Sequence, residues 1–320
     1  MGCDRAAVGL GKPNSAGVEQ SGVSAGSTRV LRKILSTARR RGILGLFAAV
    51  MGKLSRRGIS HCELYFRTLN GKRGLEIGGP SAAFKEGGIL PVYPIVAHLD
   101  GCNFSSTTVW EGQIEAGLTY EYHKGSGKGF QLICEAGRLD RIESESYDFV
   151  LASHVLEHIA NPIKAMSEWL RVLKSDGTLV LVLPHKEGTF DHRRPVATMA
   201  HLLEDFEKNT DETDLSHLPE ILELHDLSLD PEVPDQSSFR NRCLKNYENR
   251  CLHHHVFDTD LGVAIFNHFN LQILSVDPVL PINIFIMGKK VPSLQALDNC
   301  RFLDEHAEWR LRSPFMSDRR

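Results

Sequence analysis

The sequence predicts an α/β protein built on a doubly wound, mostly parallel sheet of seven strands. Short apolar runs typical of buried strands alternate with helical patterns over residues 72–288. A pair of glycines follows the first of these runs, at the place where such sheets bind nucleotides. The connection 277–281 between the last two predicted strands is too short for a crossover helix, so we expect these strands to be antiparallel.

Four parts are expected along the chain. Residues 1–28, rich in Gly, Ser and Ala, form a disordered tail; 29–71 form a basic helical arm; 72–288 form the α/β domain; and 289–320 form a C-terminal tail. The net charge of −3 gives no indication of a nucleic-acid partner. Seven scattered cysteines without CxxC spacing indicate reduced thiols, which favours a cytoplasmic protein.

The arm has two interpretations. Its basic stretch 29–57 contains an apolar run, 42–52, that is shorter than the roughly 20 residues needed to span a bilayer. It is either an amphipathic segment lying on an anionic membrane surface or a helix packed on the domain with its basic face in water. We favour packing, because the apolar residues suit a protein core equally well.

The first predicted strand, Gly74–Ile77, leads into the turn Gly78-Gly79-Pro80-Ser81 and a short helix at 81–84. Paired glycines allow the backbone to approach a ligand closely. The acid Glu76 would repel a pyrophosphate but suits a cationic ligand such as S-adenosylmethionine. The second strand, 95–100, is expected to end in Asp100, about 24 residues after Glu76. Such folds hold ribose hydroxyls with an acid at this position. The alternative is an aspartate that starts a turn before Gly101.

The remaining elements follow in order. A helix is predicted at 109–116, a strand at 130–134 and a strand at 147–153. Asn161 and Pro162 are typical of a helix start, and this helix is expected to reach Lys174 before a strand at 178–183. Residues 185–256 are acidic, rich in histidine and helical at 198–208 and 219–227, and we expect them to form a helical lid over the carboxyl edge of the sheet. The last elements are a helix at 258–268 and strands at 271–276 and 282–287.

With these motifs in place, LEIGGP, Asp100 and the run from Tyr147 to Pro184 resemble the class I S-adenosylmethionine-dependent methyltransferases, most closely the type 11 methyltransferase-domain proteins. The resemblance implies S-adenosylmethionine as cofactor. It places Glu76, Gly78 and Gly79 at the methionine part, Asp100 at the ribose, Glu135 and Ala136 at the adenine, and Ser153 and His154 beside the sulfonium. Pro80 departs from the pattern, because proline removes an amide donor where a third small residue is usual.

The runs 189–206 and 249–258 also resemble a bacterial subgroup found among surface-polysaccharide genes. This resemblance implies O-methylation of a sugar or another small polar metabolite. A nucleic acid is not expected as acceptor, because the acids of residues 204–235 would repel phosphates. No oligomeric state is predicted.

A hydroxyl acceptor must lose a proton, and histidine is well suited to take it. The candidate bases are His154, His158, His192 and His254. Residues His253–His255 cannot all face one way on a strand, so at most two of them enter a pocket. Arg193 and Arg194 are expected to bind the acceptor through their planar guanidinium groups, the alternative being a solvated loop.

His154, Glu157 and His158 would share one face of a helix and resemble a divalent-metal motif, with His185 or His192 completing the site. We favour the interpretation without metal, in which His158 lines the pocket. Two other function classes stay open. One is a catalytically inactive methyltransferase fold that binds a partner. The other is a nicotinamide-dependent oxidoreductase, which Glu76 and the antiparallel final pair disfavour.

Overall fold

The computed structural model describes residues 58–291 and 297–320. The predicted tail 1–28 and the basic stretch 29–57 lie outside the described residues, and so does the membrane contact considered for that stretch. The described residues belong to one compact unit, and the description below concerns this unit. Within the described ranges, no helix is both long enough and apolar enough to cross a bilayer.

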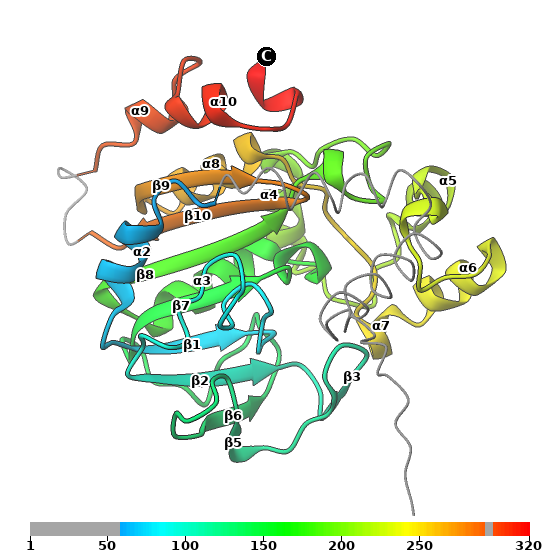
Figure 1. Ribbon diagram of the computed structural model, residues 1–320. Helices are drawn as coiled ribbons and strands as arrows, with labels where there is room; N and C mark the ends of the chain where they lie inside the picture. Colours follow the sequence, from blue (N-terminus) through cyan, green and yellow to red (C-terminus); the bar gives the residue numbers. More distant parts are fainter. Residues whose placement is uncertain (1–57, 292–296) are drawn as a thin grey trace, which may run out of the picture. The chain divides into compact units, whose positions relative to one another are not determined.

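The core of the unit is a sheet with the strand order β5-β6-β2-β1-β7-β8-β10-β9 (Figure 1). Its members are β1 (Arg73–Ile77), β2 (His98–Asn103), β5 (Gly117–Tyr120), β6 (Gly129–Ile133), β7 (Tyr147–Ser153), β8 (Leu173–Pro184), β9 (Gln272–Val279) and β10 (Asn283–Lys289). The five central strands, from β6 to β8, pair in parallel. The predicted antiparallel final pair is confirmed, since β10 pairs antiparallel with both β8 and β9.

The sheet has eight strands rather than the predicted seven, because β5 adds an antiparallel edge strand to β6. The helix predicted at 109–116 is wrong. Its residues belong to a hairpin of β3 (Thr107–Thr108) and β4 (Gly112–Gln113) and to the chain leading into β5. The β-branched run Thr107-Thr108-Val109 favours extended backbone, and Gly112 supplies the positive φ of the turn. The short helix predicted at 81–84 is likewise replaced by turns.

Two layers of apolar side chains cover the faces of the sheet. Along β7, Phe149 and Leu151 enter one layer while Val150 and Ala152 enter the other, because successive strand residues point to opposite faces. One layer packs under α3 (Pro162–Val172), α8 (Thr259–His268), α9 (Cys300–Leu303) and α10 (Glu308–Arg312); the other packs under α2 (Cys62–Leu69) and the long connection from β1 to β2.

Three helices begin where the sequence predicts them, because a side chain caps each one. The side chains of Asn161, Thr198 and Asp258 accept backbone N–H bonds at the starts of α3, α4 (Met199–Lys208) and α8. Such caps each stabilise a helix by about 1 kcal/mol. The C-terminal residues expected to be a tail pack on the sheet instead, and Trp309 is buried in the core.

The insertion, residues 185–256, carries α4 and then α5 (Leu218–Leu224), α6 (Gln236–Leu244) and α7 (Asn246–Asn249), with short 3-10 turns at Lys186–Gly188 and Leu227–Leu229. In Figure 1, α5, α6 and α7 lie beyond the carboxyl ends of β1 and β2. A small apolar core of its own holds α5 and α6 together, with Phe239 and Ile221 among its buried members. This position makes the insertion one wall of the cavity described next.

Candidate active site

A cavity of about 450 Å³ opens at the carboxyl ends of the parallel strands. Its floor is formed by the ends of β1, β2, β6, β7 and β8, through residues such as Gly78, Asn103 and Ser153. The insertion contributes Phe190, Arg250 and His253 to its walls. In an open α/β sheet this edge is the usual ligand site, and the volume is in the range of small-molecule sites.

The glycine turn is built by close contacts. Gly78 has a φ of +75°, and a Cβ there would lie 2.5 Å from the Val155 side chain. A Cβ on Gly79 would lie 2.3 Å from both the Glu76 carboxyl carbon and the Tyr120 hydroxyl. Both positions therefore require glycine, although only Gly78 lines the cavity.

Glu76 does not face the cavity, contrary to the prediction. Its side chain is fully buried behind the glycine turn, where it accepts hydrogen bonds from the hydroxyls of Tyr93 and Tyr120, both at 2.6 Å, and from the backbone N–H of Ser81. Burial raises the pKa of Glu76 to about 7, against the opposing effect of these hydrogen bonds. The acid thus fixes the shape of the turn rather than contacting a ligand.

Asp100 does not end its strand, contrary to the prediction. Strand β2 extends three residues beyond it, and its register pairs Ile77 with Cys102, so Asp100 lies in mid-strand. Its carboxylate is buried and accepts bonds from the Arg73 guanidinium, the Tyr147 hydroxyl and the backbone N–H of Phe130. Burial opposes ionisation, but these donors and His98 together lower the pKa of Asp100.

The residue at the end of β2 is Asn103, whose side-chain amide donates to the Gly79 carbonyl at 3.0 Å. It lines the cavity together with Phe104, Trp110 and Glu111. Asn103 could not be predicted as the end of the strand, because Gly101-Cys102-Asn103 lacks an apolar strand pattern and an aspartate before glycine is typical of a turn.

Glu135 and Ala136, the residues predicted at the adenine, line the cavity after β6. The Glu135 carboxylate accepts a bond of 2.6 Å from Arg250, and Arg250 also forms an ion pair with Glu212 at 3.2 Å. Burial raises the pKa of Glu135 even though Arg250 acts to lower it. Arg250 was not predicted as a site residue; it comes from the insertion and joins it to the end of β6.

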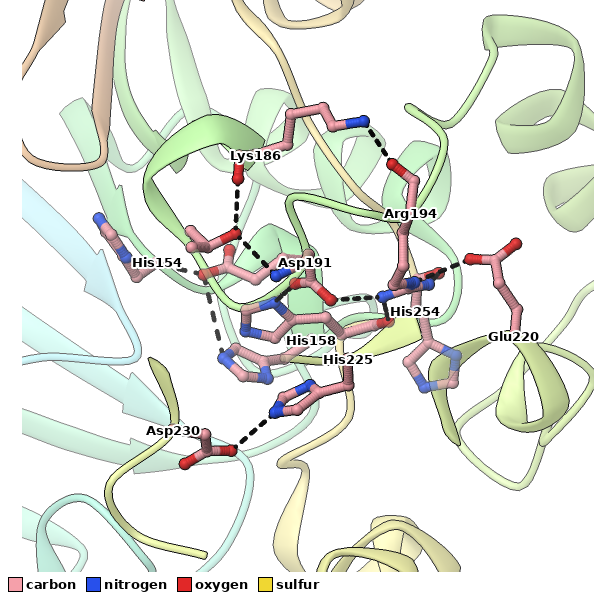
Figure 2. A network of polar contacts seen from close by, with 12 residues as sticks. His154, His158, Lys186, Asp191, Arg194, Glu220, His225, Asp230 and His254 are labelled. Atoms are coloured by element: carbon pink, nitrogen blue, oxygen red, sulfur yellow. Dashed lines mark hydrogen bonds and ion pairs between the residues drawn. The ribbon is translucent and has the colours of Figure 1, made fainter. Parts of the chain in front are cut away.

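His154, Glu157 and His158 meet just beyond the end of β7. Figure 2 shows the two histidines. One oxygen of the buried Glu157 lies 3.8 Å from Nδ1 of His154 and 3.9 Å from Nε2 of His158, and its other oxygen has no partner among the described residues. Burial raises the pKa of Glu157 and lowers the pKa of His158 well below its usual value. His158 is therefore neutral and packs its ring against His253 and Trp110.

The histidine of the triplet that reaches the cavity is His253, not His254 as predicted. Nδ1 of His253 bonds a carboxylate oxygen of the buried Asp191 at 2.5 Å. Although burial acts to raise it, the neighbouring His253 and Arg194 hold the pKa of Asp191 well below its usual range. His254 is buried elsewhere: its Nε2 contacts the Asn246 amide at 3.0 Å, and burial lowers its pKa to about 3.

Three further predicted residues lie outside the cavity. His192 and Arg193 both bond Asp226, and Arg193 keeps half of its side chain exposed. Arg194 is 1% exposed and bonds Asp191, Glu220 and two backbone carbonyls (Figure 2). Arg194 is thus an internal brace, because no donor group of its guanidinium reaches the cavity. His185, proposed to complete a metal site, is buried on Asp318.

Comparisons with known proteins agree with this arrangement. Residues 97–181 match the profile of a family described as a methyltransferase domain. The matched stretch runs from just before β2 into β8, so it contains the ends of β2, β6 and β7 that line the cavity. No curated protein matches the chain in sequence.

The chain is also similar to several solved structures. One is an S-adenosylmethionine-dependent methyltransferase from Mesorhizobium loti, with 11% identity over 71% of this chain and 95% of that chain and a TM-score of 0.41. A putative one from Listeria monocytogenes has 19% identity over 72% and 97% with a TM-score of 0.39, and one from Aquifex aeolicus has 12% identity over 76% and 98% with a TM-score of 0.37.

The family match covers β2, β6 and β7, three of the five strands whose ends form the cavity floor. The sheet is mostly parallel and has the antiparallel final pair. Residues 97–181 therefore form part of a methyltransferase domain.

Proposed function

We propose that the protein methylates an oxygen atom of a small polar acceptor such as a sugar, with His253 as the base. The observation that carries this proposal is the pair formed by His253 and the buried Asp191 on the cavity wall, 2.5 Å apart. A hydroxyl is a poor nucleophile until its proton is removed, so a dedicated base suits oxygen as the acceptor atom.

The cavity fits the cofactor in size and chemistry. Its volume of about 450 Å³ suits a molecule of this size. Gly78 presents backbone without a side chain to the cavity, and the acids Glu111, Glu135 and Glu157 suit a ligand with positive groups. When bound, S-adenosylmethionine supplies a methyl group activated by its sulfonium centre.

We assign the residues that would hold the cofactor from their places along the strand ends. Gly78 in the glycine turn and His154, the first residue after β7, would flank the methionine part of the cofactor. Asn103 and Glu111 would take the place of Asp100 as the polar groups near the ribose. Glu135 and Ala136 keep the adenine position that the resemblance implies. Pro80 lines the cavity without closing it, and the N–H that follows it, on Ser81, bonds Glu76.

His253 would take the proton at Nε2. Its Nδ1 is engaged by Asp191, which fixes the ring orientation and stabilises the imidazolium that forms. Arg194 holds the other oxygen of Asp191 at 3.0 Å, so the carboxylate is held by two partners. The acceptor would lie between His253 and the aromatic rings of Trp110 and Phe190, all of which line the cavity.

The first experiment is calorimetric titration with S-adenosylhomocysteine, followed by transfer assays with radiolabelled cofactor and a panel of sugars, polar metabolites and RNA. We expect binding by the wild-type protein, label on a sugar or another small hydroxyl compound, and loss of transfer but not of binding in His253→Gln. Binding without transfer to any acceptor would instead favour the inactive, partner-binding alternative. Label on RNA or on an amine would overturn the proposed acceptor class.

A further inference from the structure

A second group of histidines lies in the insertion, apart from the cavity. It consists of His201 and Asp205 on α4, His217 immediately before α5, and His255 in the chain between α7 and α8. None of the four residues lines the cavity. His255 and Asp205 are buried, and the side chain of His201 is one-third exposed.

The side chains converge on one point. Nε2 of His201 lies 3.0 Å from Nε2 of His217 and 3.4 Å from a carboxylate oxygen of Asp205. Nε2 of His255 lies 2.9 Å from the same oxygen, and the three histidines offer nitrogen atoms that all lie within 4.8 Å of one another. Three histidines from three separate parts of the chain therefore face a common centre, and the Asp205 carboxylate lies beside two of them.

These separations are those of a tetrahedral metal site. Ligands about 2.05 Å from a zinc ion at tetrahedral angles are about 3.3 Å apart. Three of the six separations are 3.0 Å between His201 and His217, 3.4 Å between His201 and Asp205, and 2.9 Å between His255 and Asp205, all close to this value. The ring centroids of the three histidines are 4.9, 5.4 and 5.7 Å apart, so the rings are spread around the centre instead of being stacked.

Hydrogen bonds alone explain the group poorly. Nε2 of His201 faces both a nitrogen of His217 and an oxygen of Asp205, and it has at most one proton to share between them. A divalent cation would accept lone pairs from all of these atoms at once. The second oxygen of Asp205 accepts the Thr210 hydroxyl at 3.0 Å, a supporting contact of the kind that orients carboxylate ligands.

We propose that His201, Asp205, His217 and His255 bind a structural zinc ion. Three imidazole nitrogens and one carboxylate oxygen favour zinc over magnesium or calcium, which prefer oxygen ligands alone. With four protein ligands the site is closed, so the ion has a structural role. It would tie α4 and the start of α5 to residue 255 and so fix the insertion as one wall of the cavity. This proposal does not depend on the methyl acceptor or on the base.

The test uses the full chain, stripped of metal with a chelator and then titrated with Zn²⁺ or Co²⁺. We expect one ion per chain by elemental analysis, a rise in Tm on adding Zn²⁺, and the strong visible absorption of four-coordinate Co²⁺. His217→Ala should weaken Zn²⁺ binding by at least about 100-fold. Its metal-free Tm should match that of the metal-free wild type, which separates loss of the ion from misfolding.

The matched control is Glu157→Gln. Glu157, His158 and His253 form the other group that could hold an ion among the described residues, and this group lies in the cavity. Glu157→Gln should keep the zinc and the Co²⁺ spectrum. Absence of a stoichiometric ion and of any Tm response to Zn²⁺ would overturn the proposal. So would an ion retained by His217→Ala and lost in Glu157→Gln.

Discussion

Nδ1 of His253 lies 2.5 Å from a carboxylate oxygen of Asp191, although the two residues are 62 positions apart in the sequence. Asp191 is buried and follows β8, whereas His253 comes from the far end of the insertion. The contact therefore closes the insertion as a loop and brings a histidine with one engaged nitrogen to the cavity. It also makes these two residues the first pair to test.

We expect His253→Gln to lower kcat by about 100- to 10,000-fold, because it removes the proton acceptor. Asp191→Asn should also lower kcat, because the amide no longer stabilises the imidazolium. Affinity for S-adenosylhomocysteine, measured by calorimetry, should stay within about threefold of wild type in His253→Gln. The control is His192→Ala, which removes a histidine bonded to Asp226 outside the cavity and should leave kcat unchanged. Equal losses in His253→Gln and His192→Ala would contradict this assignment.

Arg193 and Arg194 are neighbours in sequence, and the same substitution should affect them differently. Arg194→Ala removes the guanidinium that pairs with the buried Asp191 carboxylate. This loss should reduce the free energy of unfolding by about 3–5 kcal/mol. Arg193→Ala removes an ion pair from a half-exposed side chain and should change it by less than about 0.5 kcal/mol. Urea unfolding measures both, and similar losses in the two variants would contradict the role of Arg194 as an internal brace.

These neighbouring residues show what the sequence could and could not predict. Local signals placed α3, α4 and α8, because a capping side chain and an apolar face sufficed. The buried apolar run of β7 was sufficient to place that strand. The sequence does not predict which way the side chains of Arg193, Arg194 and His253–His255 point. Their directions depend on hydrogen-bond partners such as Asp191 and Asp226, most of which are distant in the sequence. The prediction that Glu76 contacts the cofactor was wrong for the same reason, since hydrogen bonds from Tyr93 and Tyr120 hold its side chain away from the cavity.

Gly79→Ala should be destabilising because the new methyl group has no room. It would lie 2.3 Å from the Glu76 carboxyl carbon and from the Tyr120 hydroxyl, both of them held by hydrogen bonds. We expect a loss of about 1–3 kcal/mol in the free energy of unfolding and weaker S-adenosylhomocysteine binding, since the turn must shift. Gly127→Ala is the matched control: nothing lies within 4 Å of its Cβ position, so stability should stay the same or rise slightly.

Glu76 should make the stability of the protein fall as the pH rises from about 4.5 to about 7. Burial raises its pKa from 4.5 in the unfolded chain to about 7 in the folded one, so unfolding releases a proton in this range. The protonated folded form is favoured below pH 4.5, and this advantage is lost progressively up to pH 7 and then stays constant. Complete loss corresponds to at most about 3 kcal/mol.

Glu76→Gln removes the titrating group and keeps an oxygen that can accept the Ser81 N–H. Urea unfolding at several pH values between 4.5 and 8 should therefore give a shallower decline for the variant, because other carboxyl groups contribute equally to both proteins. The difference in unfolding free energy between the two proteins should change across this window and remain constant above pH 7. Parallel curves would show that Glu76 keeps an ordinary pKa, and its buried contacts with Tyr93 and Tyr120 would then have to stabilise the charged form fully.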